Sequence, residues 1–571
     1  MRRNPFGVQV AMMCPSWNWR SPILLAVFWT IFKAAAADAQ ISVGELSSVE
    51  QWVAGQAEAE EIADLNKQFP KEENRQLSAH FLETLLIGTR SDVKLHHNGV
   101  RIIGACLDES IDLKNAQISS EVWLKNCQFN QIVDFRQANF AGSVFFDEST
   151  FKTDAHFNDM KVGQTASFNN AVFKGWVDFG SAGIAGDFYA IEAEFMDKVK
   201  GPSFESMKVG GLAFFRDAKF DGWWVNFLLA DFARNLEAQG VKFTNNEGRV
   251  DFYSMKVGQI ANFNDAVFEG SVDFSWADIA GNFEAKSAQF KNTVVLVMNC
   301  GGKGDFTGAK FSGSAYFAKS TFLDLVMGDT RIRDLDARSL RAERSALFTD
   351  LVVEHSADLS NADFATLDLS RSVWPKDRND GAAFDMQGMS YKYICSVSKN
   401  ETQSHQALLR LADQSAYSAD VYRRLEEFFS RQGYRGDADE AFIAGKRRER
   451  EEYFRSRQWP RWLGSWMLNL LVGYGRRPWQ AGIPCAVLVA LGCILFSPKK
   501  MEPQKREDAR RVYNRFWYSL DLFLPFVDLQ ADNVWKPKTN ERFLRHYLRV
   551  HMMLGWILIP IVLAALTGLI K

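Results

Sequence analysis

The sequence predicts a mainly β fold, a solenoid in which one short unit winds repeatedly into stacked coils. Two observations support this prediction. The motif Ala-x-Phe-x-Gly recurs five times, beginning at Ala138, Ala171, Ala218, Ala266 and Ala309. Between these copies Phe, Val or Ile recurs every five or six residues. Self-similarity at a short fixed period is typical of a solenoid.

Each unit pairs one small residue with one large apolar residue two positions later, so both side chains point inward before the chain turns. Ala fits the slot near the corner, and Phe fills the axis. Stacked coils about 4.8 Å apart can then pair backbone to backbone, while Phe stacks on Phe in ladders. With about 20 residues in each coil, some 13 coils would form a rod about 65 Å long.

Three consecutive units keep an unbroken five-residue phase of the form A-D-L/F-x-x, at 357–361, 362–366 and 367–371. They resemble the pentapeptide-repeat family, and the likeness extends with variable fidelity over roughly half the chain. The family fold implies a right-handed quadrilateral β-helix over residues 91–372. One cytoplasmic class in that family is similar to DNA in shape and charge, but export and membrane spans argue against this role here.

The sequence also repeats with a second, longer period. Met-Lys-Val-Gly begins at Met160, Met207 and Met255, 47 and 48 residues apart, and residues 166–195 match residues 261–290. Two coils plus a bulge per module would fit this spacing. The glycines are expected where the chain needs positive φ or close approach, with contact to a ligand as the alternative.

Both ends of the solenoid need a cover, because an open coil exposes an unpaired strand edge and the Phe core. Residues 40–90 have apolar positions at helical spacing and predict an α-helical N-terminal cap. Residues 373–478 predict an irregular and then α-helical connector. Its last part contains Trp459, Trp462 and Trp466 and is expected to lie in a membrane interface.

Residues 1–39 are expected to be a signal peptide. Arg2, Arg3 and Arg20 accompany an apolar run over 23–32, and Ala37-Asp38-Ala39 is a cleavage motif. The apolar run is too short to span a bilayer. Cleavage is therefore favoured, and an uncleaved anchor is the alternative.

Residues 479–571 predict a membrane domain with two C-terminal transmembrane helices, at about 479–496 and 551–570. The distribution of charge supports a C-terminal membrane domain. Residues 1–440 are acidic, with 45 Lys and Arg against 59 Asp and Glu, whereas residues 441–571 are basic, with 22 Lys and Arg against 10 Asp and Glu. The loop 498–549 contains 12 Lys and Arg. The positive-inside rule places this loop in the cytoplasm and the repeat domain in the periplasm, anchored to the inner (plasma) membrane.

A short apolar helix is expected at 516–529, between the two spans. This order is also that of a two-helix pore subunit, but Pro525-Phe526-Val527-Asp528 stands where a carbonyl filter would follow. A buried, interfacial or re-entrant helix is favoured. A conducting pore, or a sensing or ion-contact role for Asp521 and Asp528, is the alternative.

The sequence predicts no catalytic, cofactor-binding or metal-binding residues. The eight His are dispersed, and the seven Cys contain no C-x-x-C pair. A Cys106–Cys127 disulfide is an alternative to two buried thiols, although Cys106 should face outward and Cys127 inward. Asp178, Asp251 and Asp273 would form the outer Asp cluster of a carbohydrate-active enzyme, but each occurs as Val-Asp-Phe, the repeat itself.

The favoured function is a non-enzymatic, membrane-anchored scaffold that presents an acidic β-helical surface in a bacterial envelope. The expected partners are the lipid bilayer and another envelope protein, with a second copy of the chain as a further candidate. Nucleic acid and cofactors are not expected. The alternatives are a membrane sensor or pore-like subunit gated by the repeats, and a carbohydrate-active β-helix enzyme.

Overall fold

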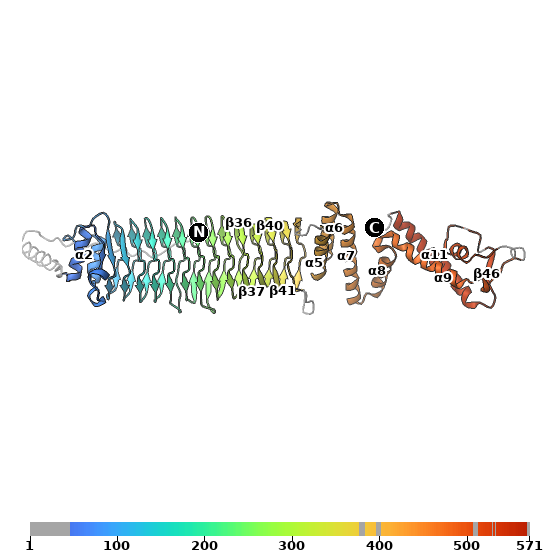
Figure 1. Cartoon of the computed structure of the whole chain (residues 1–571), viewed down its shortest axis with the longest axis horizontal. Coiled ribbons are helices and arrows are strands. Elements are labelled where there is room, and N and C mark those ends of the chain that lie inside the picture. Colours follow the sequence, from blue (N-terminus) through green and yellow to red (C-terminus); the bar gives the residue numbers. More distant parts are fainter. Residues whose placement is uncertain are drawn as a thin grey trace, which may run out of the picture.

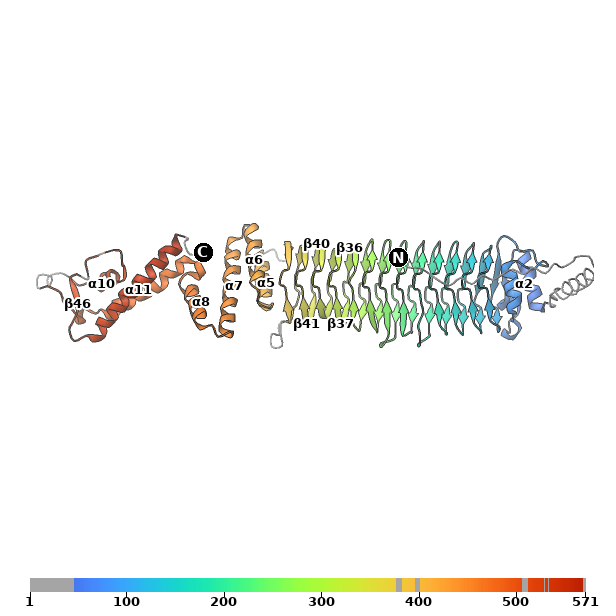
Figure 2. The same ribbon diagram turned by 180° about the vertical axis from the view of Figure 1, so that it is seen from behind.

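The computed structural model describes residues 46–375, 383–395, 401–505, 512–527, 529–531 and 533–567. It is a long rod of stacked strands with helices at both ends (Figure 1). The view from behind shows the same stacking along the whole rod and the separate helical region beyond it (Figure 2). The expected signal peptide, 1–39, lies outside the described residues.

Four short strands make the first complete coil, and each pairs in parallel with its counterpart in the next coil. The first four are β2 (Val100–Ile103), β3 (Cys106–Leu107), β4 (Ile111–Asp112) and β5 (Gln117–Ile118). Their partners are β6 (Val122–Lys125), β7 (Gln128–Phe129), β8 (Val133–Asp134) and β9 (Asn139–Phe140). The prediction of a mainly β solenoid with helices at both ends is confirmed.

One register column follows the rod through fourteen coils. Its members are Val100, Val122, Val144, Ala166, Phe188, Ala213, Leu236, Ala261, Phe283, Gly304, Leu325, Ala346, Leu367 and Ile394. At about 4.8 Å per rung, the column is about 60 Å long. Most steps are 21 or 22 residues, so the expected coil of about 20 is too short.

The coil is longer because five-residue and six-residue units alternate. Every eleventh residue between Asn115 and Asn170 has a positive φ, between 52° and 60°: Asn115, Asn126, Gln137, Glu148, Asp159 and Asn170. This left-handed conformation, which Asn and Asp tolerate best among residues other than Gly, closes the tight five-residue corner. The other corner takes six residues, so four corners together use 22.

Phenylalanine stacks along the axis in continuous ladders, as predicted. The longest contains nine rings, each nearly parallel to the next at centroid distances of 4.6–5.1 Å: Phe129, Phe151, Phe173, Phe195, Phe220, Phe243, Phe268, Phe290 and Phe311. A second ladder runs from Phe135 to Phe274. All these rings are buried, and such burial is the main favourable contribution to folding.

The Met-Lys-Val-Gly modules show how the core compensates for volume. Met160 occupies an inward slot that elsewhere holds Ala, and Val162 occupies a slot that elsewhere holds Phe; both are buried. A larger and a smaller side chain thus exchange places with little change in total volume. The glycine that follows lies at a corner against the coil below.

The coils are closest at these corner glycines. A Cβ added to Gly163, Gly210 or Gly258 would lie 2.3, 2.4 or 2.1 Å from the carbonyl oxygen of Ala141, Ala185 or Ala233. Real Cβ atoms do not approach so closely, and none of the three glycines has a positive φ. Of the two expected reasons for the glycines, close approach is therefore confirmed. A ligand is not needed to explain them.

The short strands fuse in pairs toward the C-terminal end. From β36 (Asn299–Asp305) and β37 (Lys310–Tyr316) onward the long strands cross former corners, and their pairings up to β42 (Asp363–Asp368) include a shift in register. The solenoid continues through β43 (Phe384–Asp385) and β44 (Ser390–Cys395), beyond residue 372, where the sequence loses its phase. The phase is lost because the final step of the column is 27 residues long.

The N-terminal cap contains α2 (Ser48–Glu58), α3 (Leu65–Gln68) and α4 (Ala79–Ile87). It also supplies a strand, β1 (Ala63–Asp64), which pairs with β2 of the first coil. The cap therefore satisfies the exposed strand edge with backbone hydrogen bonds, and not only by helix packing. Glu50 joins its helices: it accepts hydrogen bonds from Ser47 at the start of α2 and from Ser78 at the start of α4.

The C-terminal end of the solenoid is covered by α5 (Glu401–Gln414), α6 (Ala419–Arg431) and α7 (Arg435–Arg455). Leu425 and Phe429 of α6 belong to the same buried core as Phe384 of the last coil. The ring of Tyr391 lies 5.0 Å from that of Phe428, edge to face. These helices therefore form a second cap, where the sequence suggested a connector.

The remaining helices are α8 (Trp459–Val472), α9 (Gly482–Leu495), α10 (Arg515–Phe523) and α11 (Arg542–Leu566). Within the described residues one helix, over Arg542–Ala564, is long and apolar enough to cross a membrane; Trp479–Leu495 is apolar but shorter. Two spans were expected. The helix expected at 516–529 ends at Phe523, and α10 contacts both α9 and α11.

We expect Gly258→Ala to destabilise the solenoid by about 1–3 kcal/mol, because the added methyl group would force two coils apart. Gly183→Ala is the matched control, since a Cβ there would have no atom within 4 Å. It should change the free energy of unfolding by no more than about 0.5 kcal/mol. Urea titration followed by β circular dichroism measures both. Equal stability of the two variants would contradict the close-approach explanation.

The N-terminal cap should loosen in acid. Burial alone would raise the pKa of Glu50, but hydrogen bonds from Ser78 and Ser47 outweigh it and lower the pKa below its ordinary value. A lowered folded-state pKa stabilises the fold at neutral pH, and this contribution is lost as pH falls below about 4. Amide exchange in α2 and α4 should accelerate in that range. In Glu50→Ala exchange should already be fast at pH 7, and an unchanged pattern would contradict this role.

Candidate functional site

A column of outward polar residues runs along one face of the solenoid. Its members in successive coils are Asp112, Asp134, His156, Asp178, Ser203, Asn226, Asp251 and Asp273. The three aspartates singled out in the sequence all lie in it. Asp251 and Asp273 are direct neighbours, and Asp178 lies three coils before Asp251.

These aspartates stabilise the turns at the corners of the coils. The carboxylates of Asp178, Asp251 and Asp273 accept hydrogen bonds from the backbone N–H two residues later, at 2.8, 3.0 and 2.8 Å. Asn226 makes the same bond to the N–H of Leu228 at 2.9 Å, so the corner does not need a negative charge. This is the Asx turn, in which a short side chain imitates a backbone turn. Arg249 also bridges Asp251 and Asp273, at 3.1 and 2.9 Å.

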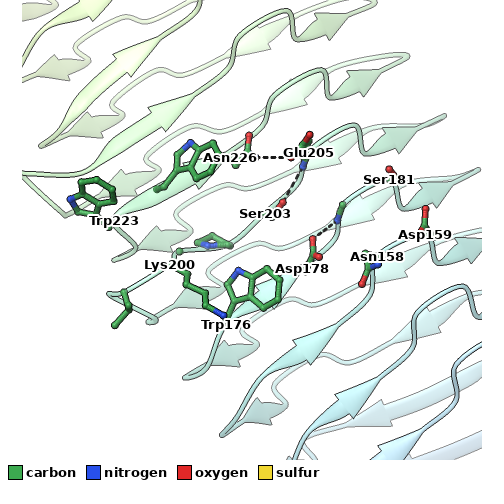
Figure 3. Close-up of a pocket in the computed structure, with 15 residues that line it drawn as sticks. Asn158, Asp159, Trp176, Asp178, Ser181, Lys200, Ser203, Glu205, Trp223 and Asn226 are labelled. Carbon is green, nitrogen blue, oxygen red and sulfur yellow. Dashed lines mark hydrogen bonds between the residues drawn. The ribbon is translucent and has the colours of Figure 1, made fainter.

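Three consecutive coils have widened corners beside this column. The register steps from Asp178 to Ser203, to Asn226 and to Asp251 are 25, 23 and 25 residues, against the usual 22. The extra residues border a surface hollow of about 580 Å³, which we call the tryptophan hollow. Figure 3 shows it, with tryptophans on one side and polar side chains on the other. Its lining includes Asp178, Lys200, Glu205, Trp176, Trp223 and Trp224.

The tryptophans of the hollow are held by the solenoid backbone. Asp178, Ser203 and Asn226 are register partners, and Trp176, Gly201 and Trp224 each lie two residues before one of them. Trp176 and Trp224 are therefore about 10 Å apart along the rod. Trp223 and Trp224 are 57% and 44% exposed. The spacing of the repeats predicts only a bulge here and not the hollow, although the Trp223-Trp224 pair is a visible departure from the repeat.

The region between α9 and α11 contains a second polar cluster. Both carboxylate oxygens of Asp521 accept backbone hydrogen bonds, from Leu529 at 2.6 Å and Ala531 at 2.7 Å. The hydroxyl of Ser519 donates to the carbonyl oxygen of Val489 at 2.8 Å. Asp521 therefore orders the chain after α10. Asp528 lies outside the described residues.

Cys106 and Cys127 are both free and buried, so no disulfide joins them. Cys106 does not reach solvent because the N-terminal cap covers it, with a backbone bridge to Gln76. Burial raises the pKa of the Cys127 thiol to about 12, which keeps it protonated and unreactive. Within the described residues no group of three or more His, Cys, Asp or Glu could hold a metal ion.

The turn role of the Asp column can be tested at Asp178, which forms no ion pair with any residue that the structure describes. Asp178→Asn should keep the hydrogen bond to the N–H of Gly180 and leave stability unchanged within about 0.5 kcal/mol. Asp178→Ala should lose about 1 kcal/mol, because the N–H loses its partner. Urea unfolding compares the two, and equal stability would contradict the role assigned to the column.

Comparison with known proteins gives one match. The segment 124–167 fits the family model described as pentapeptide repeats, in nine copies. A search of curated proteins and a search of solved structures each found no match. The matched segment lies within the solenoid, whose parallel pairing and inward small and apolar residues continue on both sides of it. The solenoid of this chain therefore contains pentapeptide repeats.

Proposed function

We propose that the chain is a non-enzymatic scaffold of the cell envelope, a right-handed, four-sided solenoid anchored in the inner membrane by two C-terminal helices. A pentapeptide-repeat solenoid is generally a structure for protein interaction. The observation that most supports the membrane anchor is the exposed apolar surface of the C-terminal helices. The solenoid and the anchor are considered in turn.

The anchor is supported by apolar side chains that nothing covers within the described structure. On α9, Ile483, Val487, Leu491 and Ile494 follow one another at helical spacing, and each is at least 43% exposed. On α11, Met553, Trp556, Ile557 and Leu563 are also exposed. Large contiguous apolar surfaces are unfavourable in water and favourable against lipid. We infer that α11 and the shorter α9 both lie in the bilayer.

The direction of insertion follows from charge. The segment 498–549, which follows α9 and includes the first residues of α11, contains 12 Lys and Arg, and this favours the cytoplasmic side. The solenoid precedes α9 and would then lie on the opposite side, in the periplasm. A signal peptide at 1–39 would supply its export.

The solenoid is suited to binding proteins because its inner and outer residues are under different constraints. Inward positions repeat, since each must fill a slot of fixed size. Outward positions between the corners vary freely, and together they form a long surface. Because both ends are capped, the rod is protected from end-to-end polymerisation through open strand edges. We propose another envelope protein as the partner, or a second copy of the chain.

The two alternative functions have less support. Ser519 and His551 are fully buried where α9, α10 and α11 meet, which favours a packed helical anchor over a gated pathway. Asp178, Asp251 and Asp273, which a carbohydrate-active enzyme would use, instead form Asx turns. Pentapeptide-repeat proteins are generally not enzymes.

Cysteine labelling tests the orientation. Val199 in the solenoid and Val512 in the loop are 80% and 93% exposed, so a cysteine at either position should react fully when accessible. In intact spheroplasts, a membrane-impermeant maleimide should label Val199→Cys and not Val512→Cys. Lysed cells should label both, and the parent chain gives the background from native cysteines. The reverse pattern would place the solenoid in the cytoplasm, and labelling of both before lysis would refute insertion.

A further inference from the structure

The tryptophan hollow has the composition of a ligand site and not of a packing defect. Three tryptophans lie together on its lining, and the two adjacent ones, Trp223 and Trp224, are substantially exposed. A soluble surface seldom presents several large aromatic side chains in one place without a partner. Two of the rings are held by paired strands: Trp176 immediately precedes β16 (Val177–Asp178), and Trp224 is the first residue of β23 (Trp224–Asn226).

A glycine beside the tryptophans lets two coils approach closely. Gly201 lies between Trp176 and Trp224 in register, with φ +81°, and a Cβ there would lie 2.5 Å from the carbonyl oxygen of Trp224. Any other residue would be strained in this conformation and would collide with the next coil. Position 201 is therefore restricted to glycine by the packing of one coil on the next. The ammonium of Lys200 lies over the ring of Trp176, 4.6 Å from its centre, and so covers one face of that ring.

Polar side chains occupy the other side of the hollow (Figure 3). Asn226 donates to Oε2 of Glu205 at 3.1 Å, and the N–H of Gly180 donates to Oδ1 of Asp178. These bonds fix both carboxylates and use one oxygen of each, so the other oxygen can accept from a ligand. Ser181 and Asn158 add further hydrogen-bonding groups to the lining.

The charge of the lining restricts the ligand. Asp159, Asp178 and Glu205 provide three carboxylates against the single ammonium of Lys200. This excess of negative charge repels a polyanion. The carboxylates favour a ligand rich in hydroxyl or amide donors, and the tryptophans favour one with a flat apolar face.

We propose that the tryptophan hollow binds a neutral polysaccharide chain. A pyranose ring combines an apolar C–H face, which stacks on tryptophan, with hydroxyl groups around its rim, which donate to carboxylates. Trp176 and Trp224, two coils apart, form successive platforms along the rod, and Asp178 and Glu205 hold hydroxyl groups beside them. The proposal depends on the solenoid alone and holds for either orientation of the chain in the membrane.

The direct test is binding of the full-length protein, in lipid nanodiscs without sugar-based detergent, to an array of oligosaccharides. The array holds neutral glucans, neutral N-acetylated oligomers and anionic oligouronates. We expect binding to at least one neutral series, increasing with chain length, and none to the oligouronates. Binding to no neutral oligosaccharide, or only to the oligouronates, would overturn the proposal.

Variants then locate the binding. Trp176→Ala and Trp224→Ala should each weaken the affinity for the neutral oligosaccharide by about tenfold or more, equivalent to about 1.4 kcal/mol. Trp224→Phe should retain most of it, because an aromatic face remains. The matched control is Trp276→Ala, since Trp276 is 66% exposed on the same solenoid but outside the lining.

Circular dichroism and the thermal midpoint establish that each variant is folded. If Trp276→Ala weakened binding as much as Trp224→Ala, the contact would be general surface adsorption, and the proposal would be wrong. It would also be wrong if both variants of the hollow bound normally. Neither result depends on the labelling experiment, so this site and the membrane topology can fail separately.

Discussion

The stacking of Phe on Phe in register with the parallel backbone pairing is the constraint on which the rest of the structure depends. A ring can lie 4.6–5.1 Å above the next only if successive coils place the same atoms over one another. The backbone ladder imposes the same spacing of about 4.8 Å. Ring stacking and backbone pairing favour the same register, so a coil that slipped in register would lose the ring stacking and the backbone hydrogen bonds together. The inward positions of the register column are consequently small or apolar through fourteen coils.

This constraint leaves the corners as the places where the chain can change. Tight corners need a residue that tolerates positive φ and an Asx acceptor, whereas wide corners accept added residues because these project outward and leave the core intact. The Trp223-Trp224 pair and the residues around Gly201 lie in such widened corners. Asp178, Ser203 and Asn226 of the Asp column therefore line the tryptophan hollow while they keep their register. The same separation explains why the Asp column, although conspicuous, is structural.

Several features of the fold could be predicted from the sequence, and particular residues show why others could not. Pairs such as Ala138 and Phe140 indicate the solenoid, because the two inward residues of a unit are only two positions apart in the sequence. The length of the coil was underestimated because the six-residue corner has no single signature. The strand β1 and the burial of Cys106 were missed, since both arise from contact between the cap and the first coil. Residues 384–395 were assigned to a connector because a longer corner interrupts the period before them.

The sequence by itself determined the architecture. Each repeat unit contains its own small residue, large apolar residue and turn residues, and it packs only against the neighbouring units. The Phe ladders and the close approach at Gly163 follow from that repetition. Only the tertiary structure decided what lies on the outside. Trp176, Gly201 and Trp224 are separated by 25 and 23 residues along the chain and share one line only after the coils stack. A site made between coils depends on exact corner lengths, and those are set by packing against the coil below.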